Sequence, residues 1–275
     1  FTEPNTVHDL KAEYVGMTSV NLTWTVNSTA SSSYMYKIEV VNGTSVRNLT
    51  SSVTKTEINE LLPGMMYNFT VFAVVNDSQM EGRGLSISLY TKPSPVLDLK
   101  AEYVGMTAVS LTWTVNDTGS SSYMYRIEVA NGPSVRNLSS SAASVEITEL
   151  LPGTMYSFTV FAAVNDGQTE GEGVSIDLYT KPSPVLDLKA EYVGAEKVSL
   201  TWTVNDTASS TYTYRIEVAN GPSVRNLSSS AASVEITELL PGTMYSFTVF
   251  AAVNDGQTEG EGVSIDLYTS KSRFL

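Results

Sequence analysis

The sequence predicts an all-β protein of three tandem antiparallel β-sandwiches, each with about seven strands, joined into an elongated array. The first observation is a repeat, because the string LTWTVN occurs around Trp24, Trp113 and Trp202, at a spacing of 89 residues. The second is an alternation of apolar and polar residues over runs of five to seven, which is typical of strands with one buried face. The third is that turn residues separate these runs, as an antiparallel sandwich requires.

The repeat divides the chain into three modules and a tail. A second string, LLPGxMY, ends at Tyr67, Tyr156 and Tyr245, at the same spacing of 89 residues. Residues 92–180 and 181–269 differ at six positions only, whereas residues 1–91 are more diverged and keep both strings. We therefore expect modules at 1–91, 92–180 and 181–269, followed by a tail at 270–275.

The strands of the middle module can be expected one by one. Alternating residues predict strands over 109–115, 123–129, 156–162 and 174–178. The pair Asn131-Gly132, with its counterparts at 42 and 220, predicts a tight hairpin turn whose two central residues both take positive φ. Pro152-Gly153 marks another turn before the strand at 156–162. We expect helix nowhere.

The segments between modules are expected to be stiff. Pro93-Ser94-Pro95 and Pro182-Ser183-Pro184 each place two prolines within three residues. Proline fixes φ and removes an amide donor, so such a connector is short and extended. The three modules are therefore expected to stack end to end as a rod.

Composition excludes several classes of function. The net charge is −13, and an acidic surface repels phosphate backbones and anionic lipid heads, so we expect no nucleic acid partner. No run approaches 18 apolar residues, so we expect no direct membrane insertion of this segment. There is no cysteine, and His8 is the single histidine, which removes thiol catalysis, cysteine-ligated metals and a repeated Ser-His-Asp triad. We expect no enzymatic activity and no catalytic, cofactor or metal site.

The landmarks resemble those of the fibronectin type III family, an immunoglobulin-like sandwich fold. A tryptophan on the second strand, Trp113 in the middle copy, is followed by the L-x-P-G-x-x-Y corner that ends at Tyr156. The resemblance implies a core around the indole, and a corner tyrosine whose hydroxyl bonds back to the backbone. These structural core residues are Trp24, Trp113, Trp202, Tyr67, Tyr156 and Tyr245.

At a finer level, the modules resemble the ectodomain repeats of receptor-type protein tyrosine phosphatases, in the density-enhanced (eta) and vascular endothelial group. The segments PSPVLDLKAE, SSYMYRIEV and LLPGTMYSFTVFA carry this resemblance. It implies an extracellular adhesion, ligand-binding and spacer segment of a cell-surface receptor, with any phosphatase domain outside it. Implied partners are extracellular or matrix proteins, or a second copy of the chain. Two alternatives stay open: a mechanical matrix spacer of the tenascin or fibronectin type, and an engineered repeat scaffold.

Ten Asn-x-Ser/Thr sequons point to the same compartment. Each falls on an expected loop or an outward strand position, where a glycan would be solvated. We therefore predict a location on the extracellular side of the plasma membrane or in the secreted fraction. The N-glycosylation candidates are Asn21, Asn27, Asn42, Asn48, Asn68, Asn76, Asn116, Asn137, Asn205 and Asn226.

An acidic loop at residues 165–173 lies between the last two expected strands of the middle module. By resemblance, related modules present integrin ligands there, but no Arg-Gly-Asp occurs in this loop. Its carboxylates are compatible with a weak calcium site, which would need six to eight oxygen ligands. A solvated loop is the preferred interpretation, because the spacing matches no EF-hand pattern.

Overall fold

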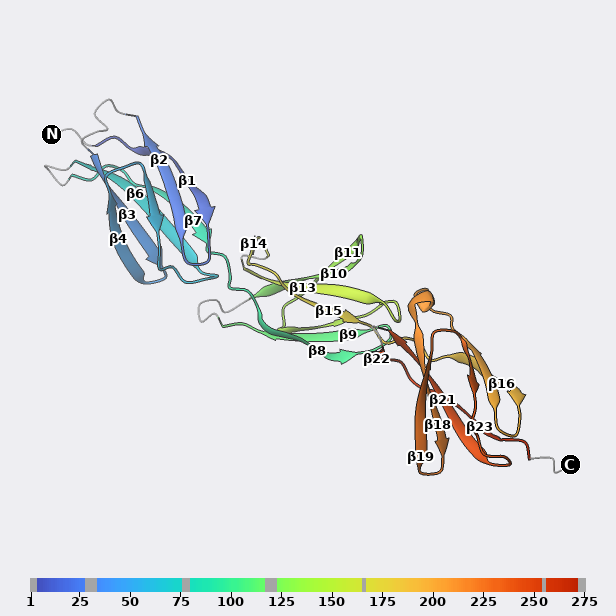
Figure 1. Cartoon of the computed structure of the whole chain (residues 1–275). Coiled ribbons are helices and arrows are strands. Elements are labelled where there is room, and N and C mark those ends of the chain that lie inside the picture. Colours follow the sequence, from blue (N-terminus) through green and yellow to red (C-terminus); the bar gives the residue numbers. More distant parts are fainter. Residues whose placement is uncertain are drawn as a thin grey trace.

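The computed structural model describes residues 4–27, 34–75, 80–116, 123–164, 167–253 and 256–271. Three β-sandwiches follow one another along an extended array, with the two ends of the chain at opposite ends of it (Figure 1). We call the sandwich of strands β1–β7 module 1, that of β8–β15 module 2 and that of β16–β23 module 3. The all-β fold with antiparallel sheets that the sequence predicts is confirmed.

Module 1 has two antiparallel sheets. The three-stranded sheet has the order β1-β2-β5, and the four-stranded sheet has the order β4-β3-β6-β7. The strands are β1 (Val7–Val15), β2 (Val20–Val26), β3 (Tyr34–Asn42), β4 (Ser45–Ser51), β5 (Lys55–Ile58), β6 (Met66–Val75) and β7 (Leu85–Tyr90).

Modules 2 and 3 repeat this arrangement and add a two-residue strand before the last one. In module 2 the sheets are β12-β9-β8 and β11-β10-β13-β14, with β15 also paired to β13. Its strands are β8 (Leu97–Val104), β9 (Val109–Thr114), β10 (Met124–Asn131), β11 (Ser134–Ser140), β12 (Ser144–Ile147), β13 (Met155–Val164), β14 (Thr169–Glu170) and β15 (Val174–Tyr179).

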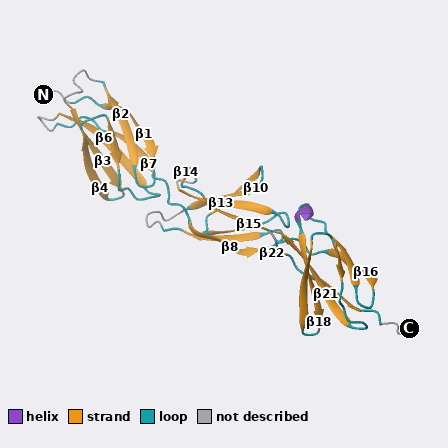
Figure 2. Ribbon diagram, in the orientation of Figure 1, coloured by secondary structure: helices purple, strands orange, loops and turns teal. Residues whose placement is uncertain are grey.

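Module 3 has the sheets β16-β17-β20 and β19-β18-β21-β22, with β23 paired to β21. Figure 2 shows the one helical element among the described residues, the short 3-10 turn η2 (Ser209–Thr211). The strands are β16 (Leu186–Val193), β17 (Val198–Thr203), β18 (Thr213–Asn220), β19 (Ser223–Ser229), β20 (Ser233–Ile236), β21 (Met244–Val253), β22 (Thr258–Glu259) and β23 (Val263–Tyr268).

Each module buries its own core between its two sheets. Along β13, Tyr156, Phe158 and Val160 point inward and are buried, while the residues between them are partly exposed. Completely burying a side chain such as Phe158 stabilises the fold by about 1.5–3 kcal/mol. The buried residues form three separate clusters, one for each module.

The hairpin between β10 and β11 differs from the expectation. Asn131 pairs with Ser134, so Gly132 and Pro133 are the two loop residues. Gly132 has a φ of +55°, whereas Asn131 is not among the residues with positive φ. The predicted turn with two positive φ angles is therefore wrong, because glycine stands at the first central position, which needs positive φ on its own.

A bulge at the start of the first strand was not predicted. In module 2 the register between β8 and β9 shifts between Leu97 and Lys100, and Asp98 takes a φ of +52°. Thr114 Oγ1 donates a hydrogen bond of 3.1 Å to Asp98 Oδ2. The same bulge recurs at Asp9 and Asp187.

Module junctions and exposed faces as candidate functional sites

The predicted core tryptophans and tyrosines are buried, and each tryptophan meets a further tyrosine of its own core. Trp113 is 3% exposed, and its ring meets that of Tyr125 edge to face, with centroids 5.0 Å apart. Such an aromatic pair adds about 0.5–1.5 kcal/mol beyond its buried area. Trp24 with Tyr36 and Trp202 with Tyr214 repeat the arrangement in the other modules.

The corner tyrosine of each module accepts a hydrogen bond from the main chain. In module 2, Leu151 N donates to Tyr156 Oη at 3.0 Å. Thr180, which is completely buried, tightens the same corner because its hydroxyl donates to Leu151 O at 2.7 Å and accepts from Thr154 N at 3.0 Å. The equivalent bonds form at Tyr67 with Thr91 and at Tyr245 with Thr269. Sequence reasoning missed these threonines, although their 89-residue spacing was visible.

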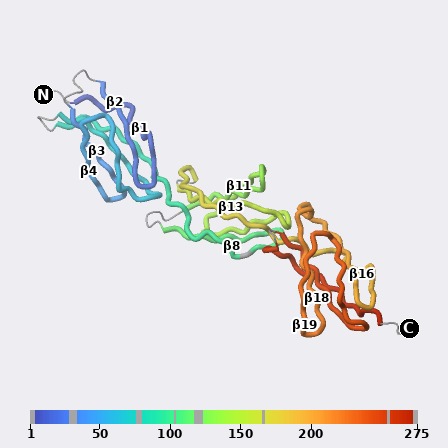
Figure 3. The backbone as a smooth tube through the Cα atoms, in the orientation of Figure 1, coloured from blue at the N-terminus to red at the C-terminus, as the bar shows by residue number. Residues whose placement is uncertain are grey.

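The first linker residue is held by the module that precedes it. Lys181 N donates to Gly105 O at 2.9 Å, and Gly153 N donates to Lys181 O at 3.1 Å. Lys92 makes the same two bonds with Gly16 and Gly64 at the first junction. Figure 3 follows the backbone through these short connections from module to module. The start of each linker is therefore a continuation of the module before it.

The rest of the second linker is held by the module that follows. Asp206 Oδ2 accepts a hydrogen bond of 2.8 Å from Ser183 N and another of 2.6 Å from Tyr212 Oη. Tyr212 is buried, and burial together with the Asp206 carboxylate raises the pKa of its phenol. One carboxylate thus joins linker and tyrosine in module 3.

Tyr212 also reaches across to module 2. Its ring lies against Gly153, where a Cβ atom would clash with the phenol. At the first junction, a Cβ on Gly64 would lie 2.7 Å from Tyr123 Oη. Gly64 and Gly153 are buried, while Gly242, their counterpart in module 3, is exposed. Each junction therefore pairs a glycine of one module with a tyrosine of the next, a pairing that sequence reasoning missed because it joins residues of separate modules.

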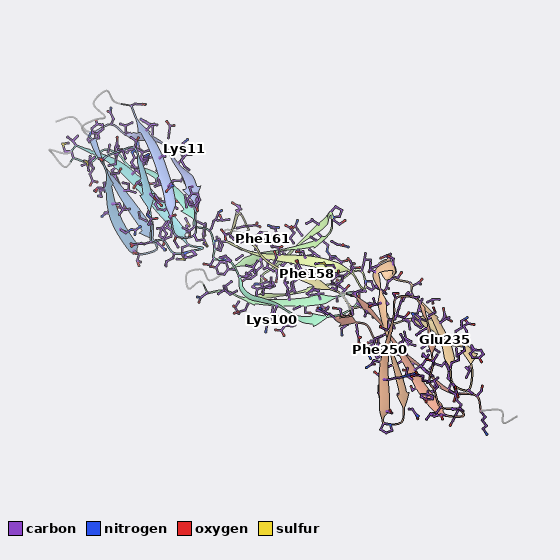
Figure 4. The ribbon with its side chains drawn as sticks, viewed as in Figure 1. Lys11, Lys100, Phe158, Phe161, Glu235 and Phe250 are labelled. Atoms are coloured by element: carbon purple, nitrogen blue, oxygen red, sulfur yellow. The ribbon has the colours of Figure 1, made fainter. Side chains whose placement is uncertain are left out.

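The outward face of the larger sheet carries an ion pair beside an aromatic ring. Arg126 on β10 makes two hydrogen bonds to Glu170 on β14, at 2.8 and 3.0 Å, and its guanidinium lies 3.9 Å from the ring centre of Phe161. Arg215, Glu259 and Phe250 repeat the group. Figure 4 labels Phe161 and Phe250.

This ion pair corrects the interpretation of the acidic loop at Glu170, whereas Glu172 and Gly173 are exposed as expected. Residues 165 and 166 lie outside the described residues, but Glu170 is held by Arg126 rather than solvated. Among the described parts of the chain, no three acidic or histidine side chains gather into a group that could hold a metal ion.

The sequons occupy environments of three kinds. Asn48, Asn137 and Asn226 are exposed on β4, β11 and β19, and Asn27, Asn116 and Asn205 are exposed just beyond β2, β9 and β17. Asn21, Asn42 and Asn68 are partly buried; the Oδ1 atom of Asn21 is buried without a described partner, and Asn68 lies on the central strand β6. Asn76 lies outside the described residues. Glycosylation of each stays a prediction.

A shallow hollow lies beside the corner of module 2. It has a volume of about 320 Å³ and is lined by residues that include Val135, Arg136, Leu151 and Tyr156. A hollow of about 250 Å³ occupies the same place in module 1. Separately, no helix in the described part of the chain is long and apolar enough to cross a membrane.

Comparison with known proteins gives one family and several relatives. The family model described as "Fibronectin type III domain" matches residues 5–87, 93–177 and 182–266. The chain is 63% identical over 273 residues to the receptor-type tyrosine-protein phosphatase eta of Gallus gallus, covering 99% of this chain and 19% of that protein. It is 34% identical over 274 residues to the phosphatase eta of Mus musculus, covering 98% of this chain and 21% of the relative.

More distant matches come from the extracellular matrix and from solved structures. Tenascin-R of Gallus gallus is 24% identical over 85% of this chain and 18% of its own length. A solved two-domain fibronectin type III segment of chicken tenascin covers 63% of this chain and 99% of its own, with 17% identity and a TM-score of 0.44. The chain thus spans about a fifth of the length of the curated relatives that it matches.

Proposed function

Since this chain belongs to the fibronectin type III domain family, we propose that it is a spacer and ligand-binding segment in the extracellular region of a receptor-type tyrosine phosphatase. The observation that carries the proposal is the 63% sequence identity between this chain and the phosphatase eta of Gallus gallus. This similarity extends over 99% of this chain. The matched part consists of three fibronectin type III modules. Any phosphatase activity would therefore belong to another part of the protein.

The junctions support the spacer role. The first residue of each linker forms hydrogen bonds with the preceding module. In the second linker, Ser183 N also donates to Asp206 of the following module, and Asp206 in turn accepts from Tyr212. Prolines on both sides of Ser183 remove further backbone freedom. Such a segment holds its ends apart and presents the faces between them to extracellular or matrix proteins.

An antibody against the folded three-module chain tests the receptor proposal. Cells of the organism that makes this protein are labelled with a membrane-impermeant biotin reagent. The antigen is then precipitated from detergent extracts of these cells. We expect a biotinylated protein that dephosphorylates a phosphotyrosine peptide. Recovery of the antigen without detergent, from matrix that lacks this activity, would contradict the proposal and would favour a matrix spacer, the candidate that the similarity to Tenascin-R supports.

The ligand-binding part has its own test. The glycosylated chain, secreted from animal cells, is immobilised and exposed to solubilised surface and matrix proteins, which are then identified by mass spectrometry. Chains with Val135→Asp or Val224→Asp serve as surface variants, because both valines are more than half exposed. Saturable binding of one extracellular protein supports the proposal, and loss of that binding in one variant locates the face. Retention of no protein above a bare surface would leave only the spacer role.

A further inference from the structure

We propose that N-linked glycans on Asn137 and Asn226 cover the free edge strands β11 and β19, and so prevent the larger sheets from adding a strand of a second copy. The proposal rests on the extracellular placement proposed above, and extends it to particular sites and a purpose. It begins from a repeated position, because the sequon Asn-Leu-Ser/Thr occurs at Asn48, Asn137 and Asn226, in register in all three modules.

The strand that carries Asn137 is a sheet edge with little protection of its own. β11 lies at the end of the order β11-β10-β13-β14, and its seven residues pair with β10 without a register shift. Edge strands expose unpaired backbone groups and are usually protected by bulges, shortness or charge. On the other sheet of module 2, β8 has two register shifts and β12 has four residues. In contrast, Arg136 is the single charged residue of β11. Its neighbour Val135 is apolar and 55% exposed.

The side chain of Asn137 is presented for modification. Leu138 packs on the core, so its neighbours Asn137 and Ser139 point outward, and both are exposed. Arg126 Nη1 donates a hydrogen bond of 3.0 Å to Asn137 Oδ1, and Arg215 does the same for Asn226 at 3.0 Å. This contact uses the amide oxygen, and Nδ2, the atom that carries a glycan, takes no part in it. The folded state therefore accommodates the modified residue and fixes its direction.

The modification itself needs a sugar donor from the secretory pathway. The Nδ2 atom of asparagine attacks the anomeric carbon of an oligosaccharide that is held on a lipid pyrophosphate. The new N-glycosidic bond forms as the carbon–oxygen bond to the pyrophosphate breaks. The lipid pyrophosphate leaves, and Nδ2 gives up one proton.

The other sequons lie in different environments from those at Asn137 and Asn226, so they can serve as controls. Asn116 and Asn205 are exposed just beyond β9 and β17, so glycans there would not lie on a sheet edge. Asn21 and Asn68 are partly buried on inner strands of their sheets. The near identity of modules 2 and 3 gives edge protection a purpose, because matching strands of neighbouring copies can pair with one another.

The test compares secreted chains that differ only in their sequons. The edge variant is Ser139→Ala with Ser228→Ala, which removes both sequons and keeps the Arg126–Asn137 and Arg215–Asn226 hydrogen bonds. The control is Thr118→Ala with Thr207→Ala, which removes the sequons at Asn116 and Asn205. Glycopeptide mass spectrometry measures occupancy, and sedimentation velocity measures association at matched concentrations.

We expect Asn137 and Asn226 to carry glycans in most wild-type chains, and the edge variant to lose both. The edge variant then forms dimers or larger species at concentrations where wild type and control are monomeric, and all three melt at similar temperatures. If Asn137 and Asn226 carry no glycan in a chain that is glycosylated at Asn205, the proposal of glycans on the edge strands is wrong. The proposed extracellular function would not be affected by that result. A monomeric edge variant would overturn the protective role. Natural protein without a glycan at any sequon would instead contradict the extracellular placement itself.

Asn137→Gln with Asn226→Gln provides a second route to the same comparison. Glutamine is not an acceptor, so this variant also loses both glycans if the Ser→Ala chain is poorly produced. Association by both edge variants supports the proposal, and monomers in both contradict it.

Discussion

The phenol of Tyr212 in module 3 occupies the space above Gly153 in module 2, where a side chain on residue 153 would project. The same relationship joins Tyr123 to Gly64 at the first junction. Glycine is required there for two reasons. Gly153 has a φ of +57°, which other residues adopt at a cost of about 1–2 kcal/mol, and any Cβ would displace the tyrosine.

Replacement of Gly153 is expected to loosen the junction between modules 2 and 3. In Gly153→Ala the new methyl group clashes with Tyr212, so the contact between modules 2 and 3 is lost. The ensemble of conformations that fits the small-angle scattering data then covers a wider range of overall lengths. Gly242→Ala is the matched control, because Gly242 has a φ of +60° but is exposed. Both variants pay the backbone cost of about 1–2 kcal/mol, and only Gly153→Ala changes the scattering. An unchanged profile for both would show that the glycine–tyrosine contact does not set the junction.

The stability of module 3 is expected to fall in alkaline solution because of Tyr212. Burial and the Asp206 carboxylate raise the pKa of its phenol above the ordinary value. The unfolded chain therefore loses the proton first, near pH 10, and the neutral phenol stabilises the folded state less and less as pH rises further. Urea unfolding of wild type and Tyr212→Phe is compared from pH 8 to about 11. Wild type is more stable at pH 8 and loses more stability above pH 10; parallel curves would contradict this assignment.

Loss of the corner hydroxyl in module 2 is expected to destabilise that module alone. Tyr156→Phe leaves Leu151 N without the acceptor that it has at 3.0 Å, which costs about 1–3 kcal/mol. Because β13 and β15 have the same sequences as β21 and β23, amide exchange is followed by NMR on chains in which only module 2 or only module 3 is isotope-labelled. Tyr245→Phe is the reciprocal control, with faster exchange confined to module 3. Equal effects on both modules from one substitution would mean that the corners are coupled along the array.

The ion pair on the outer face of module 2 is expected to hold β14 in place. Arg126→Lys loses the two-bond contact with Glu170 and much of the stacking on Phe161. Both partners are about one-third exposed, so the loss is about 0.5–1.5 kcal/mol. Amide exchange at Thr169 and Glu170 then quickens, while β12 on the other sheet keeps its protection. Unchanged exchange at these residues would show that β14 is held by its backbone pairing alone.

Module 1 supplies a natural comparison for that last prediction. Lys37 takes the place of Arg126 there, and pairs with Glu81 at 2.8 Å and lies 5.3 Å from the ring centre of Phe72. In module 1 the strand equivalent to β14 is reduced to an isolated bridge between Val74 and Glu81. A lysine can make the pair but cannot offer the planar two-bond fork.

The sequence by itself determined the number of modules, their fold class and the buried faces of their main strands, all of which depend on a local pattern repeated within one module. Alternation along 156–162 predicted which side chains of β13 are buried, because a strand turns successive side chains to opposite faces. Alternating runs separated by turn residues predicted the sandwich, and the resemblance of the segments around Trp113 and Tyr156 to the fibronectin type III family implied its corner. The turn at Asn131-Gly132 was misjudged by one residue, since hairpin register is set by the pairing of both strands and not by the dipeptide.

Only the tertiary structure decided what happens between strands and between modules. Nothing local to Tyr212 indicates that its ring covers Gly153, because this contact joins residues of separate modules. Its hydroxyl meets Asp206 through the fold of the loop between β17 and β18, which the alternation pattern does not describe. Glu170 was expected in solvent, and the fold instead brings Arg126 to it from 44 residues away. Contacts of this kind follow from the packing of whole sheets, which periodicity along the chain does not encode.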